Sequence, residues 1–183
     1  MKRIFAVLSP IVAASFLVQV TLAQAPAIAA CGTDSRNYTF QTDSDISIPS
    51  PAQGMATVMV IEDQVEVRPG AGVCIKCASQ LTLGMDGQWI AATHGFSHTA
   101  ISIPAGDHHF CVSSSGPVLA PDVLPAMLGL HVEAGKTYFV RGRLARYYRE
   151  GLAVLDLTEI NEDEGRYLVS VSKRSLFTKK ATP

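Results

Sequence analysis

Short β-branched segments separated by glycine and aspartate turns fill most of this sequence, and they restrict its fold to a β architecture. Asp86-Gly87 is the clearest turn, because both residues accept the positive φ that a tight hairpin needs. From Ala56 onward the expected strands are 56–62, 80–85, 88–93, 98–104, 108–114, 128–133, 137–148 and 152–160. This spacing predicts a mainly β fold, a single antiparallel β-sandwich of about eight short strands.

The segment before these strands is polar and contains several turn residues. Residues 30–54 include Pro49, Pro51 and Gly54, which interrupt regular structure. We therefore predict an N-terminal arm over 30–54, with a short strand at 37–42.

A short helix is predicted near the C-terminus. Asn161, followed three residues later by Glu164, has the spacing of a helix N-cap. Leu168 and Val171 lie one turn apart and are expected to face the sheet. The predicted sandwich domain is then 55–177, and 178–183 form a polar tail.

The first 29 residues have the composition of a bacterial secretory signal. Lys2 and Arg3 precede an apolar run that ends at about Leu22, and small residues suited to a signal peptidase follow. The sequence therefore predicts a periplasmic or extracellular protein. The segment 28–31 also fits a lipobox ending at Cys31, so the alternative is an outer-membrane lipoprotein anchored through that residue.

Charge and motifs argue against several functions. The formal net charge is −1, and no basic stripe is present to neutralise phosphates, so nucleic-acid binding is disfavoured. The sequence also lacks the serine elbow, the zinc-protease helix motif and the phosphate-binding glycine loop. We expect a non-enzymatic protein without a cofactor or a small-molecule substrate.

Three stretches, "MDGQW", "IPAGDHHFCV" and "VEAGKTYFVRGR", resemble an uncharacterised family of exported bacterial β domains. That family is known only as a domain of unknown function and is allied to PEGA-like sandwiches. The resemblance covers about Met55 to Leu176. It implies a small sandwich outside the cytoplasm, often a lipoprotein, and it implies no activity and no catalytic residues.

Four cysteines remain after the predicted signal. In the strand 108–114, alternation places Cys111 on the face opposite Phe110. A disulfide from Cys31 to Cys111 would clamp the arm over that sheet, and closing a loop of about 80 residues is worth roughly 4 kcal/mol in the chain-entropy model. Cys74 and Cys77 would then pair with each other.

A metal site is the alternative use of these cysteines. Cys74, Cys77, His109 and Cys111 could supply a tetrahedral set with the short cysteine spacing of zinc sites. The runner-up function is therefore a periplasmic metal-binding protein.

The segment 113–129 combines regularly spaced prolines with apolar residues. Proline at this spacing excludes a regular helix. Its apolar residues either cover a sheet edge or contact an envelope protein or a membrane surface. The candidate partner-binding residues are Val118, Leu119, Val123 and Leu124.

Overall fold

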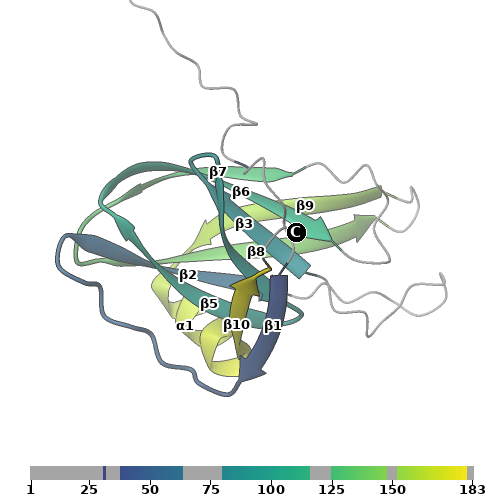
Figure 1. Ribbon diagram of the computed structural model, residues 1–183, viewed down its shortest axis with the longest axis horizontal. Helices are drawn as coiled ribbons and strands as arrows, with labels where there is room; N and C mark the ends of the chain where they lie inside the picture. The colour runs from purple at the N-terminus through teal and green to yellow at the C-terminus, as the bar shows by residue number, and fades with distance from the viewer. Residues whose placement is uncertain (1–30, 32–37, 64–79, 116–124, 148–151, 181–183) are drawn as a thin grey trace, which may run out of the picture.

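Two β-sheets and one short helix make up the described part of the chain (Figure 1). The computed structural model describes Cys31 and residues 38–63, 80–115, 125–147 and 152–180. The elements are β1 (Tyr38–Asp43), β2 (Met55–Asp63), β3 (Gln80–Met85), β4 (Gln88–His94), β5 (Ser97–Pro104), β6 (Gly106–Ser115), β7 (Ala126–Val132), β8 (Thr137–Tyr147), β9 (Leu152–Ile160), α1 (Glu162–Val171) and β10 (Lys173–Lys179).

The six-stranded sheet has the order β1-β10-β5-β2-β8-β9, and the four-stranded sheet has the order β4-β3-β6-β7. The predicted mainly β sandwich with a C-terminal helix is confirmed. Two of the pairings, β10 with β5 and β2 with β8, are parallel. The prediction of an antiparallel sandwich is wrong at these two places, because in each pair the chain reaches the second strand by a crossover through other elements, as parallel pairing requires.

Strand β2 lies between β5 and β8 and is buried on both faces. Val58 and Val60 belong to the main core between the sheets, together with Phe110 of β6. Met59 and Ile61 point to the opposite face, where they join a second core that includes residues of α1. Covering both faces explains why β2 is almost continuously apolar instead of alternating.

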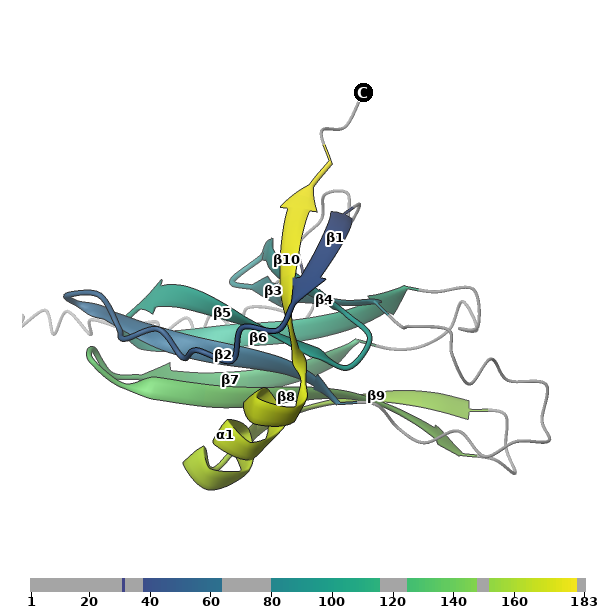
Figure 2. The same cartoon turned by 90° about the horizontal axis from the view of Figure 1, so that it is seen from below.

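The helix starts where the sequence predicts. Asn161 is the N-cap, and its side-chain oxygen accepts a hydrogen bond from the Glu164 amide at 2.9 Å. Figure 2 shows α1 beside β8. Its buried residues are Gly165, Leu168 and Val169, whereas Val171 is 48% exposed. The prediction that Val171 faces the sheet is wrong, because the glycine side of the helix packs against the sheet instead.

Strand β10 was not predicted, and it replaces the start of the expected polar tail. It pairs antiparallel with β1 over six residue pairs, from Tyr38–Lys179 to Asp43–Arg174. In Figure 2 this two-stranded ribbon projects away from the stacked strands. The short strand predicted within the arm at 37–42 is therefore present as β1, an edge strand. The part after β1 crosses the second core, where Ile48 packs.

Candidate functional site

A disulfide joins Cys31 to Cys111, with Cα atoms 5.3 Å apart and a sequence separation of 80 residues. This is the pairing expected from the sequence. Phe110 and Val112 point into the main core, and Cys111 lies on the other face of β6. Cys111 is nevertheless 0% exposed. The bond therefore fixes the start of the N-terminal segment to the four-stranded sheet.

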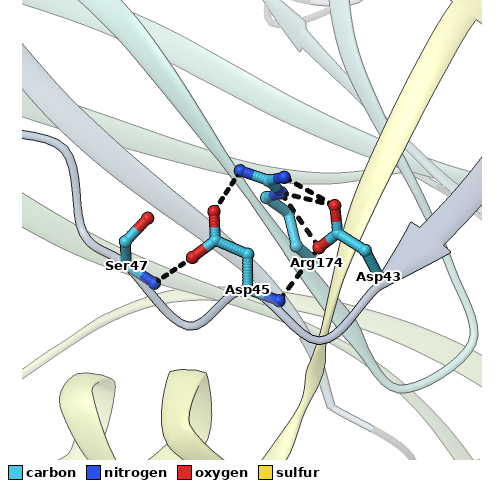
Figure 3. A network of polar contacts seen from close by, with 4 residues as sticks. All are labelled: Asp43, Asp45, Ser47 and Arg174. Atoms are coloured by element: carbon cyan, nitrogen blue, oxygen red, sulfur yellow. Dashed lines mark hydrogen bonds and ion pairs between the residues drawn. The ribbon is translucent and has the colours of Figure 1, made fainter.

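Arg174 of β10 holds the chain that leaves β1 (Figure 3). Its guanidinium donates to both carboxylate oxygens of Asp43, at 2.5–3.2 Å, and also to Asp45. The Asp45 amide donates to Asp43 at 3.0 Å, and the Ser47 amide donates to Asp45 at 2.8 Å. One cation therefore organises a turn of five residues.

The electrostatics follow these contacts. The hydrogen bond from Arg174 is the main reason that the pKa of Asp43 is lowered. For Asp45, the Ser47 amide is the main cause of a lowered pKa. Both carboxylates are thus held in the charged form. Through Arg174 they attach the chain after β1 to β10.

His98 of β5 is buried beneath this turn, at 1% exposure. Its Nδ1 lies 2.8 Å from the hydroxyl of Ser172, the residue that caps the C-terminus of α1. Burial is the main reason that the pKa of His98 is lowered. The serine and histidine have the spacing of a nucleophile and its base, but the hydroxyl is buried, so a substrate would not reach it in this conformation.

A second histidine contact lies at the other end of β5. Asp86 has a φ of 50° and Gly87 a φ of 86°, as the predicted hairpin turn requires. One carboxylate oxygen of Asp86 lies 2.7 Å from His108 Nδ1, and the other accepts the His109 amide at 2.9 Å. His108 Nε2 lies 2.9 Å from the Pro104 carbonyl oxygen.

The contacts of this pair favour the charged form of each group. Burial disfavours the Asp86 carboxylate, but the hydrogen bonds from the His109 amide and from His108 outweigh it, and the pKa of Asp86 is lowered. Burial likewise disfavours the His108 imidazolium, but its bonds to Asp86 and to the Pro104 carbonyl outweigh it, so the pKa of His108 is raised. The "DG" and "HH" pairs in the sequence were the only signal for this contact.

The structure describes two of the four residues of the proposed metal set, both in β6. His109 is exposed on β6, and Cys111 is bonded to Cys31, so it cannot act as a thiolate ligand while that bond is intact. Cys74 and Cys77 lie outside the described residues, and their pairing stays a prediction. In the part of the chain that the structure describes, no three His, Cys, Asp or Glu side chains are placed to hold a metal ion.

The predicted partner-binding residues Val118, Leu119, Val123 and Leu124 also lie outside the described residues. Among the described residues, no helix is long and apolar enough to cross a membrane. A comparison with protein-family models and with characterised proteins found no match. The resemblance to exported β domains therefore stays a prediction.

Proposed function

We propose that the protein is an exported, non-enzymatic β-sandwich module of the bacterial cell envelope, acting as a structural or protein-interaction domain. The observation that carries this proposal is the Cys31–Cys111 disulfide. Disulfides form and persist in oxidising compartments such as the periplasm, and the first 29 residues have the composition of a secretory signal.

The use of the charged side chains supports a scaffold rather than a catalyst. Arg174 joins β10 to the turn after β1, and His98 contacts the C-cap of α1. Asp86 fixes a hairpin turn to β6. Groups that could act as acids, bases or nucleophiles are thus engaged in connecting elements of the fold.

The two possible roles of Cys31 exclude each other. A sulfur atom bonded to Cys111 cannot also form the thioether that attaches a lipid. The disulfide therefore favours a periplasmic or secreted domain over a lipoprotein anchored at this residue.

The candidate contact region for a partner is the apolar proline-containing segment predicted from the sequence. To test it, Val118, Leu119, Val123 and Leu124 would all be replaced by serine, and two properties compared with wild type: the urea midpoint, and photo-crosslinking to envelope components from a probe placed in this segment. A partner-binding segment predicts an unchanged midpoint and lost crosslinks.

A matched control is a double variant on the outer face of α1. Tyr167 and Val171 are 64% and 48% exposed, and their replacement by serine should change neither property. A large drop in the midpoint of the quadruple variant would show that the segment packs into the fold. Each fully buried side chain would contribute about 1.5–3 kcal/mol to the free energy of unfolding, so four of them would lower the urea midpoint strongly. That result would overturn the assigned contact region.

A further inference from the structure

His108 contacts two acceptors at once, and this arrangement favours the charged ring. Its Nδ1 lies 2.7 Å from a carboxylate oxygen of Asp86, and its Nε2 lies 2.9 Å from the carbonyl oxygen of Pro104. Neither oxygen can donate a hydrogen bond. A neutral imidazole carries a proton on only one ring nitrogen, so both contacts can be hydrogen bonds only in the imidazolium form.

The three groups belong to three different segments. Asp86 lies in the turn between β3 and β4, Pro104 ends β5, and His108 lies near the start of β6. Strand β5 belongs to the six-stranded sheet and β6 to the four-stranded sheet. The imidazolium therefore connects the corner where the chain passes between the sheets with the neighbouring hairpin turn.

Backbone groups also take part in the connection between the hairpin turn and β6. The Asp86 amide donates to the His109 carbonyl at 3.0 Å, and the His109 amide donates to the Asp86 carboxylate at 2.9 Å. The hairpin turn is thus tied to β6 by bonds that do not involve the imidazole ring. The contact between Pro104 and His108 is the one that depends on the second ring proton.

We propose that His108 is a proton-dependent latch, which as an imidazolium holds the β5–β6 corner closed and on deprotonation releases the Pro104 carbonyl. The carboxylate is the stronger acceptor, so the proton that remains on the neutral ring stays on Nδ1, facing Asp86. Nε2 then presents a lone pair to the carbonyl oxygen of Pro104. These two groups repel each other, and the corner opens.

The acidic groups around the ring favour its charged form. Asp86 comes from the hairpin turn, and Asp107 and His109 flank His108 on β6. From β7, His131 contacts Asp107 at 2.7 Å, and β5 contributes the Pro104 carbonyl. The side chain of His108 is only 11% exposed, so solvent screens its contact with Asp86 only partly.

The test is an NMR titration of the full chain labelled with ¹⁵N-histidine and with ¹³C at the Pro104 carbonyl. At about pH 6.5, the ordinary midpoint of histidine, both ring nitrogens of His108 should carry protons. Its midpoint should lie above that value. The Pro104 carbonyl signal should shift with the same midpoint, and the neutral ring should keep its proton on Nδ1.

Two variants sharpen the experiment. Asp86→Asn removes the charged acceptor and should lower the midpoint of His108. His131→Asn is the matched control, because it removes an exposed histidine–aspartate pair with the same 2.7 Å spacing, and it should leave the Pro104 signal unchanged. A neutral His108 ring at pH 6.5, or a Pro104 carbonyl that does not follow the titration, would overturn the latch. Both results come from the wild-type protein, so they hold even if Asp86→Asn does not fold.

Discussion

Gly165 is a described glycine at which one added methyl group should clearly lower the free energy of unfolding. It lies in α1 directly against Phe139 of β8, and a Cβ atom added there would lie 2.2 Å from Cγ and 2.7 Å from Cβ of that residue. In an exposed helix, Gly→Ala would stabilise by about 1 kcal/mol. We expect the opposite sign here, because the added atom enters a fully packed contact.

The size of the effect follows from two opposing contributions. Overpacking a core typically costs about 1–3 kcal/mol. The upper end applies, because the clash reaches the Cβ atom of Phe139, and rotating its ring alone cannot relieve it. Subtracting a helix-propensity gain of about 1 kcal/mol leaves a net loss of about 2 kcal/mol in the free energy of unfolding.

The assay is urea unfolding, in which the midpoint falls at an unchanged slope. Ser170→Ala, at an exposed position of the same helix, is the control and should not lower the midpoint. In a Phe139→Ala background, the cost of Gly165→Ala should be smaller, because the ring contacts are removed while the contact with the Cβ atom remains, giving a coupling energy between the two sites. A raised midpoint for Gly165→Ala in the wild-type background would refute the close packing of α1 on β8.

Three further predictions concern other contacts. Because burial lowers the pKa of His98, the unfolded chain binds a proton that the folded chain excludes; stability should therefore fall as the pH drops below about 6.5 and level off below the folded pKa. Urea midpoints from pH 5 to 7.5 should show this slope, and it should be absent in His98→Asn. Arg174→Gln should speed amide hydrogen exchange in β1 while leaving β2 protected, since it removes the cation that binds Asp43 and Asp45; equal acceleration in both strands would contradict a local clamp. Gly142→Ala should cost less than Gly165→Ala, because the closest contact of its Cβ, at 2.9 Å, is with the tip of the Leu81 side chain, and a larger loss in urea unfolding would refute that ranking.

Local features of the fold could be predicted from sequence. The hairpin at Asp86-Gly87 and the helix start at Asn161 each depend on residues within a few positions of one another. Strand β10 was missed because "KRSLFTK" is short, charged at both ends and apolar only in its middle. Its partner β1 lies more than 100 residues earlier, so nothing local indicates the pairing.

The polar contacts were mostly beyond prediction for the same reason. His98 and Ser172 are 74 residues apart, and Asp86 and His108 are 22 apart. Which residues meet depends on how the strands are ordered in the sheets. The disulfide was the exception, because alternation in the strand around Cys111 and the need to anchor an arm beginning at Cys31 both favoured the same pairing.

The most direct test of the proposed role is non-reducing peptide mapping of the protein isolated from the envelope of the cells that produce it, with thiols blocked at lysis. We expect a peptide pair in which Cys31 is linked to Cys111, and the pair should disappear on reduction. A lipid attached to Cys31, or alkylated free thiols at these two positions, would contradict it.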